Sequence, residues 1–150
     1  YQTAEIIAQK LNLSIIKEER FRERNLGILQ GFTLREFKDK HLSDYNMYKG
    51  IDPEYIIPQG ESKIQRHKRC IGALNDIAVA NPGKNIFIVT HGGILDSIFR
   101  MVLNIPLSIP RNFSLINGSI NKFSFSRGEW KLEIWGDISH LKGLSALDDF

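Results

Sequence analysis

Cysteine is almost absent from this sequence, in which Cys70 is the single one. One cysteine excludes a disulfide framework and a cysteine-rich zinc site, and it is typical of a reducing compartment, so we expect a cytoplasmic location. Long apolar runs are absent too: no stretch approaches the roughly 18–20 residues that a membrane helix needs. We therefore expect no membrane partner.

Charge of one sign is in only small excess, since 20 Lys and Arg against 17 Asp and Glu give a net charge of +3. The two signs alternate through most of the chain, with the basic stretch Lys63–Arg69 as the exception. A nucleic-acid-binding surface usually has a longer basic stripe with aromatic neighbours, so we expect no nucleic-acid partner. A solvated helix face is the simplest interpretation of Lys63–Arg69, and a site for an anionic small molecule is the alternative.

The length of 150 residues, with 42% hydrophobic and 25% charged residues, allows one domain with its own core. Amphipathic patterns predict helices over residues 2–11 and 33–45, from 61 to about 80, and over 95–102, closed before Pro106. Apolar runs predict strands at 14–18 and 86–90, the latter buried on both faces, and alternation over 123–134 predicts a hairpin that turns at Arg127-Gly128. The pattern predicts an α/β fold: a three-layer sandwich with a mostly parallel central sheet and a C-terminal antiparallel hairpin.

His91-Gly92-Gly93 follows the predicted buried strand directly and opens a helical pattern. In an open α/β sheet, ligands bind beyond the carboxyl ends of the strands. Glycines let the backbone approach a ligand closely, and the N–H groups at a helix start favour an anion. We predict that His91 binds a phosphoryl oxygen there, with a simple helix-capping histidine as the alternative.

Two further segments carry candidate site residues. Glu23 lies between Arg22 and Arg24 in a glycine-punctuated loop, which makes it a candidate general acid or base. A surface ion-pair run is the competing interpretation. Glu61 and Ser62 stand at a helix entry, where both residue types also act simply as caps.

Taken in order, these segments resemble the histidine phosphatase superfamily, the phosphoglycerate-mutase-like phosphatases. The resemblance covers essentially the whole chain. It rests on an N-terminal helix, an acid-bearing loop, a helix entry with its later arginine, a histidine-glycine-glycine segment and the closing strands: Gln2–Ile7, Glu23–Gly31, Gly60–Ser62 with Arg69, Ile88–Gly93, Asn117–Ser119 and Asp137–Leu141.

The family's first strand ends in Arg-His-Gly, whose histidine is the nucleophile that takes up the phosphoryl group. No Arg-His-Gly occurs in this sequence. We therefore expect residues 1–150 to be a partial histidine-phosphatase-like domain that lacks an N-terminal strand and helix, on the order of 30–60 residues. We also expect these residues to be inactive by themselves.

The resemblance implies phosphomonoester hydrolysis through a phosphohistidine, with no metal and no cofactor. Glu23 is then the proton donor that later activates water, while His91 and the Gly92 amide hold phosphoryl oxygens. Arg22 and Arg24 bind the substrate's second anionic group or hold Glu23. The residues that orient these groups are Glu61, Ser62 and Arg69.

The spacing favours a phosphatase over a phosphoglycerate mutase. Family mutases have a long insertion after the acid loop, whereas Glu23 and Glu61 are only 38 positions apart here. A mutase remains an alternative, as does an inactive module of the same fold that binds a phospho-ligand or a protein. The expected partner is a phosphorylated small molecule of unspecified identity, and the aromatic residues after 122 permit a homodimer or only a core.

Overall fold

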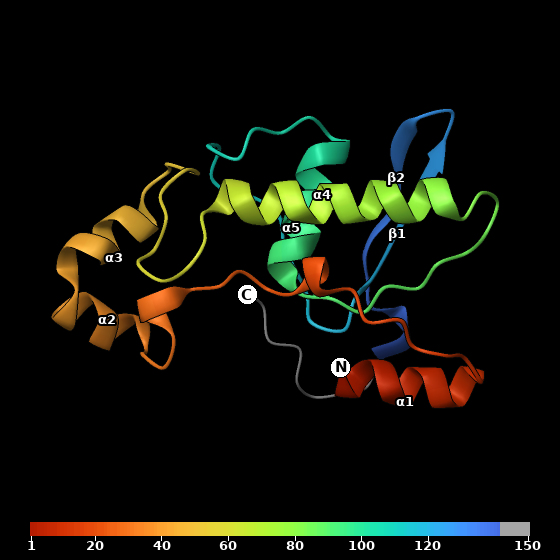
Figure 1. Ribbon diagram of the computed structural model, residues 1–150, viewed down its shortest axis with the longest axis horizontal. Helices are drawn as coiled ribbons and strands as arrows, with labels where there is room; N and C mark the ends of the chain where they lie inside the picture. The colour runs from red at the N-terminus through yellow and green to blue at the C-terminus, as the bar shows by residue number, and fades with distance from the viewer. Residues whose placement is uncertain (142–150) are drawn as a thin grey trace.

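The computed structural model describes residues 1–141 (Figure 1). None of the helices in this range combines the length and apolarity that crossing a membrane requires. Short 3₁₀ turns occupy Glu19–Phe21, Gly27–Leu29 and Ser139–Leu141. The helices and strands, in chain order, are α1 (Gln2–Leu11), α2 (Leu34–Lys40), α3 (Leu42–Lys49), α4 (Lys63–Ala80), α5 (Gly92–Val102), β1 (Ile120–Ser126) and β2 (Glu129–Asp137).

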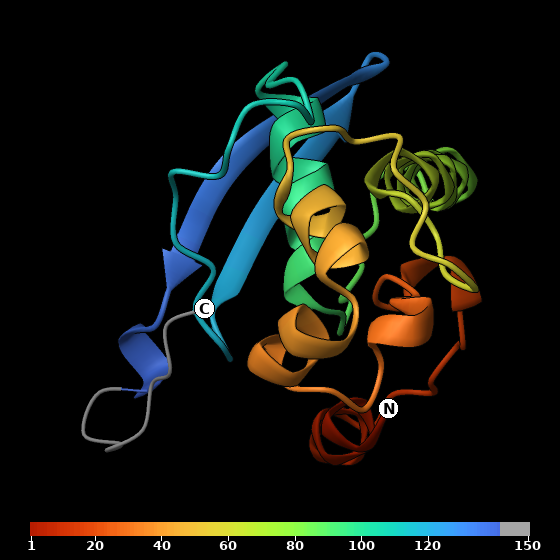
Figure 2. The same ribbon diagram turned by 90° about the vertical axis from the view of Figure 1, so that its left-hand side faces the viewer.

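The core forms where α4 crosses α5 (Figure 1). Figure 2 shows α5 between the β1–β2 hairpin and α4, with α1 at the bottom of the view. The α2–α3 pair lies in front of α5 in that view, but Figure 1 shows it apart from the crossing, beyond the N-terminal end of α4. The buried cluster at the crossing joins one residue of the loop before Glu23 to both helices: Phe21, Cys70, Ala73, Leu74, Ile94 and Ile98. This core holds the start of α5 against the loop that carries Glu23.

The helices begin where local capping signals predict. Thr33 and Glu36 form a capping box at α2, and Ser62 and Gln65 form another at α4. The predicted helix 33–45 is two helices, because the backbone leaves helical geometry at His41, which has φ −137° and ψ 56°. The other three predicted helices are confirmed.

The predicted C-terminal hairpin is confirmed as β1 and β2, which pair antiparallel. Arg127 and Gly128 have φ of 53° and 83°, and two successive positive φ angles match the twist of a tight hairpin. Phe123 and Trp130 pack against the core, and Trp135 contacts Phe99 at 4.3 Å between ring centroids. The aromatic residues of the hairpin therefore pack within the chain, and the homodimer stays a prediction.

Two predicted strands are not formed. Residues 14–18 are irregular, and Ile16 is 90% exposed. Residues 86–90 are irregular as well. This strand was expected to be buried on both faces, but its Phe87 is 60% exposed. Within residues 1–141 the β1–β2 hairpin is the only sheet, so neither segment has a strand to pair with, and a strand without a hydrogen-bonded neighbour is not stable.

Candidate active site

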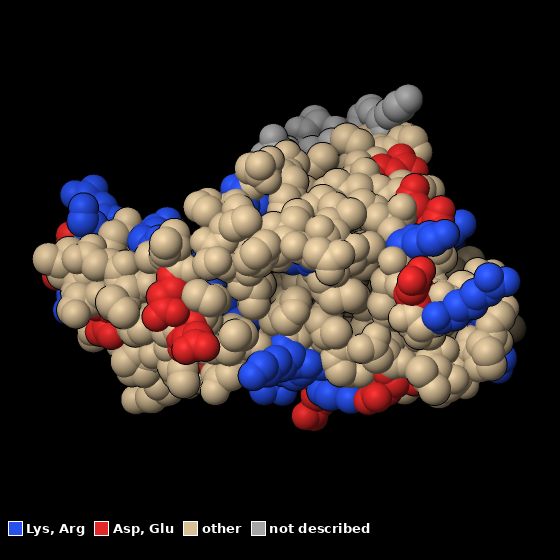
Figure 3. All heavy atoms as spheres, turned by 90° about the horizontal axis from the view of Figure 1, so that it is seen from above, with Lys and Arg blue, Asp and Glu red and all other residues tan. Residues whose placement is uncertain are grey.

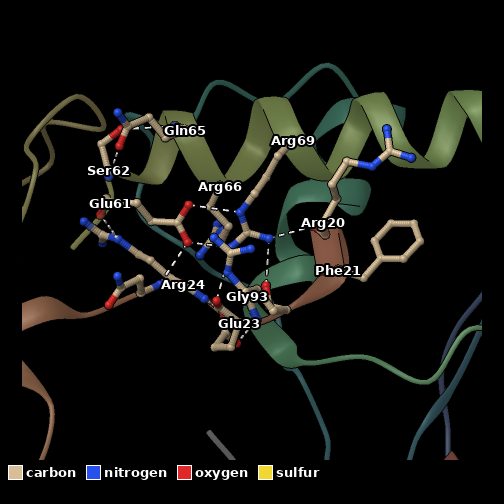
Figure 4. A network of polar contacts seen from close by, with 12 residues as sticks. Arg20, Phe21, Glu23, Arg24, Glu61, Ser62, Gln65, Arg66, Arg69 and Gly93 are labelled. Carbon is tan, nitrogen blue, oxygen red and sulfur yellow. Dashed lines mark hydrogen bonds and ion pairs between the residues drawn. The ribbon is translucent and has the colours of Figure 1, made fainter. Parts of the chain in front are cut away.

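The Glu23 carboxylate is held by two backbone amides. Arg24 N donates to Glu23 Oε1 at 2.7 Å, and Gly93 N donates to Glu23 Oε2 at 2.9 Å (Figure 4). Gly93 lies in the first turn of α5, so the carboxylate occupies the positive end of that helix. Glu23 therefore lies at the helix start that follows His91, and the structure brings these two predicted residues to one place.

Glycine at position 93 is required by this contact. A Cβ added there would collide with the Glu23 carboxylate and would lie 2.8 Å from Arg66 Nη1. The sequence pattern predicted close approach of a ligand at both Gly92 and Gly93. A Cβ at Gly92 would meet only Leu115 Cδ1 at 3.6 Å. The close approach is at Gly93, and a contact between residues 70 positions apart leaves no local signal in the sequence.

Neither neighbouring arginine forms an ion pair with Glu23 among residues 1–141. Arg22 is exposed to solvent. Arg24 is buried at 8% exposure and donates from Nε to the Glu61 carbonyl at 2.8 Å and from Nη2 to the Tyr55 carbonyl at 3.3 Å. The interpretation of this segment as a surface ion-pair run is therefore wrong, and so is the expectation that the two guanidinium groups hold Glu23.

Arg69 of α4 joins the helix to the Glu23 loop. Its guanidinium donates to the carbonyls of Arg20 (2.7 Å), Arg22 (2.8 Å) and Glu23 (3.1 Å). The same group pairs with Glu61 through contacts of 2.5 and 3.0 Å (Figure 4). Arg69 thus fixes three carbonyls around Glu23 and satisfies a partly buried carboxylate.

Glu61 completes this arrangement from the other side of the loop. Its Oε1 accepts from Asn25 N at 2.9 Å, so it contacts both Arg69 and the residue after Arg24. Burial disfavours its charge, but the hydrogen bonds from Arg69 and Asn25 outweigh burial and lower the pKa of Glu61. Ser62 is the N-cap of α4, as the capping interpretation expected, and touches the site only through that helix.

His91 and Gly92 lie exposed at the start of α5. His91 is the N-cap residue but makes no side-chain capping bond, so its imidazole is available on the surface. A hollow of about 2340 Å³ adjoins it. Both predicted catalytic residues line this hollow, together with Arg24, Gly92, Gly93 and Arg66.

The basic stretch Lys63–Arg69 is not a solvated helix face. Lys68 is exposed, but Arg66 is only 8% exposed and points from α4 toward Glu23 and Gly93 (Figure 4). Arg66 donates to Ser97 Oγ at 3.2 Å and pairs with Asp96 Oδ2 at 3.1 Å. The predicted site omitted Arg66, although the unusual density of basic residues was the signal for it.

The chemistry of the site is that of an anion pocket with a carboxylate inside it. A helix start, an exposed imidazole and a buried guanidinium surround Glu23, and such groups stabilise negative charge that develops during a transfer reaction. Residues 1–141 contain no group of three or more His, Cys, Asp and Glu side chains placed to hold a metal ion.

Comparison with known proteins identifies the family. Residues 1–138 match the model of the histidine phosphatase superfamily (branch 1), and the chain belongs to this family. Phosphoglycerate mutase-like protein 4 of Arabidopsis thaliana is 32% identical over 145 residues, which are 95% of this chain and 62% of that protein. A metal-independent phosphoserine phosphatase of Arabidopsis thaliana is 30% identical over 134 residues, 89% of this chain and 55% of that protein.

A solved structure agrees with the fold. Bacillus stearothermophilus YhfR superimposes with a TM-score of 0.81 at 25% identity, over 94% of this chain and 70% of that one. The chain therefore spans only part of its relatives, and less than two thirds of both Arabidopsis proteins. The comparisons establish the family and the α/β fold of this chain.

Proposed function

We propose that this chain is the larger part of a metal-independent phosphatase that hydrolyses phosphomonoesters of small molecules. The observation that carries the proposal is the Glu23 carboxylate, held on the Gly93 amide at the start of α5, two residues after His91. A proton donor and a phosphoryl-binding histidine at one helix start are what the hydrolysis of a phosphomonoester needs. A relative named as a metal-independent phosphoserine phosphatase supports the same class of reaction.

The proposed reaction has two steps. A histidine outside this sequence attacks phosphorus and forms a phosphohistidine, while Glu23 gives its proton to the leaving oxygen. Glu23 then takes a proton from water, which attacks the phosphohistidine and releases phosphate. His91 and the Gly92 amide bind the phosphoryl oxygens in both steps, and the Arg69–Glu61 pair keeps Glu23 in place.

The proposal also accounts for the exposed segment 86–90. We propose that the strand carrying the attacking histidine pairs with these residues and completes a parallel sheet in the middle of a three-layer sandwich. The hollow beside them is lined by apolar side chains from both this segment and β1, among them Phe87, Phe123 and Phe125. A strand with its own apolar side chains fits such a lining.

Two alternatives predict different behaviour. A binding module that has lost its nucleophile would hold phosphate without turnover. A mutase would transfer the phosphoryl group between two positions of phosphoglycerate and release little phosphate. The phosphatase is favoured by the short segment between Glu23 and Glu61, which leaves little room for a mutase insertion.

The test is to trap the intermediate in the full-length protein. The protein is mixed with phosphate-labelled substrate and quenched, and the label is tested for acid lability and alkali stability, the signature of phosphohistidine. We expect labelled protein together with release of phosphate. Turnover without phosphohistidine would refute the mechanism, and binding without turnover would establish the module instead.

A further inference from the structure

Three basic side chains that line the hollow have no part in the two reaction steps proposed above. Lys63 and Arg66 come from the first turns of α4, and Arg24 comes from the loop. All three line the hollow that Glu23 and His91 also line. Lys63 donates to the Gly50 carbonyl at 3.3 Å, and Arg24 lies 6.0 Å from the Tyr48 ring, so this group extends from Glu23 toward α3.

Positive charge is in excess at this place. Asp96 pairs with Arg66 at 3.1 Å but also with Arg100 at 2.9 Å, so one carboxylate serves two guanidinium groups. Among residues 1–141, Arg24 and Lys63 form no ion pair, and their contacts are with backbone carbonyls. Both oxygens of the Glu23 carboxylate accept hydrogen bonds from backbone amides, so Glu23 forms no ion pair with these side chains.

This excess charge is partly shielded from water, which makes it costly. Burial lowers the pKa of Arg24, and the nearby Arg66 guanidinium lowers it further. Burial also lowers the pKa of Lys63, followed by repulsion from Arg24 and Arg66. A bound anion would remove the repulsion among all three groups, because it would supply the missing negative charge.

The place of these residues indicates which part of a substrate they meet. A proton donor must reach the leaving oxygen, so groups beside Glu23 on the side of α3 face the alcohol part of the phosphomonoester. We propose that Arg24, Lys63 and Arg66 form a subsite for a second anionic group, a carboxylate or a further phosphate, on the leaving group of the substrate. The inference rests on the proposed function, because it takes Glu23 as the proton donor.

Binding of phosphonates to the full-length protein tests the subsite without any turnover. The probes share a three-carbon length: 3-phosphonopropanoate carries a carboxylate, propane-1,3-bisphosphonate carries a second phosphonate, and propylphosphonate carries neither. We expect calorimetry to show at least about tenfold tighter binding of one or both doubly anionic probes than of propylphosphonate, since charge-assisted hydrogen bonds are strong. The probe that binds better distinguishes a carboxylate from a phosphate.

The variants Arg66→Gln and Lys63→Gln should each weaken the binding of the preferred doubly anionic probe by about tenfold or more. The affinity for propylphosphonate should fall much less. Arg66→Lys should restore part of it. Lys68→Gln is the matched control, because Lys68 lies on the same helix but is exposed and does not line the hollow. Lys63→Gln keeps the test valid if Arg66→Gln does not fold.

If the variants lost equal affinity for all three probes, the subsite would be overturned, because the residues would then bind the phosphoryl group or only support the fold. A wild-type protein without preference for a second anion would also overturn it. Failure of the proposed function is read separately, as absence of phosphate release from para-nitrophenyl phosphate and glycerol phosphate.

Discussion

Replacing Glu23 by glutamine separates proton transfer from charge stabilisation. General acid catalysis is worth about 10²–10⁴-fold, or roughly 3–5 kcal/mol of barrier. We expect the full-length Glu23→Gln protein to lose rate in that range on alkyl phosphates, whose leaving oxygen needs a proton. On para-nitrophenyl phosphate the first step should be impaired much less, so that phosphohistidine accumulates while its hydrolysis stays slow.

The contacts of Glu23 also give the cost in stability. Both carboxylate oxygens accept a backbone N–H, from Arg24 at 2.7 Å and from Gly93 at 2.9 Å. A glutamine side chain has only one acceptor oxygen, so one charge-assisted bond is lost, at a cost of about 1.5–3 kcal/mol. The variant should therefore unfold at a lower temperature and yet remain folded at 25 °C.

The assay is single-turnover quenched flow with both substrates, together with thermal unfolding. Glu129→Gln is the matched control, because Glu129 is exposed on β2 and outside the hollow. His91→Ala should slow both substrates together, since charge stabilisation does not depend on the leaving group. Equal losses for Glu23→Gln on both substrates in the phosphorylation step would refute its assignment as the acid.

Three other predictions follow from the same contacts. Arg69→Gln should cost about 2–4 kcal/mol in urea unfolding, because it leaves three carbonyls without their donor and a partly buried carboxylate without its ion-pair partner. The lowered pKa of Glu61 means that its contribution to stability is present above the ordinary glutamate pKa and is lost as pH falls through the folded value. The variant should therefore lose the part of this acid dependence that Arg69 supplies and keep the part that the Asn25 amide supplies. Gly93→Ala should abolish the contact with Glu23 and lower both activity and melting temperature, whereas Gly72→Ala, which has open space around its Cβ in the middle of α4, should stabilise by about 0.5–1 kcal/mol; equal effects would contradict the steric argument. Phosphatase activity should survive excess chelator. If chelator abolished the activity and added zinc or magnesium restored it, arginine and histidine would not be the groups that neutralise the phosphoryl charge.

The helices could be predicted because their signals are local. Thr33 with Glu36 and Ser62 with Gln65 specify helix starts within four residues, and both capping boxes form. The hairpin turn was predictable for the same reason, since Arg127-Gly128 adopts the two positive φ angles that a tight turn needs. A strand differs because its stability comes from a neighbour, which is why residues 86–90 read as a strand but do not form one here.

The site was predictable in its residues but not in its contacts. The sequence pattern pointed to Glu23 and His91 separately, and the fold brings Glu23 to Gly93, two residues beyond His91. It did not reveal that Arg24 turns away from Glu23 to two carbonyls, nor that Arg66 turns inward while Lys68 stays in solvent. Which of Arg66 and Lys68 turns inward depends on which face of α4 meets the core, and a run of basic residues does not specify that face.

The contacts of Arg69 have a mechanical consequence. With three loop carbonyls and Glu61 bound to one guanidinium, the Glu23 loop and the start of α4 must move as a single body. The first glycine beyond this body with open space around its Cβ position is Gly31, at φ 83°. A swinging motion of α2 and α3 about Gly31 would move Tyr48 and Lys49 of α3, which line the hollow, without displacing the proton donor.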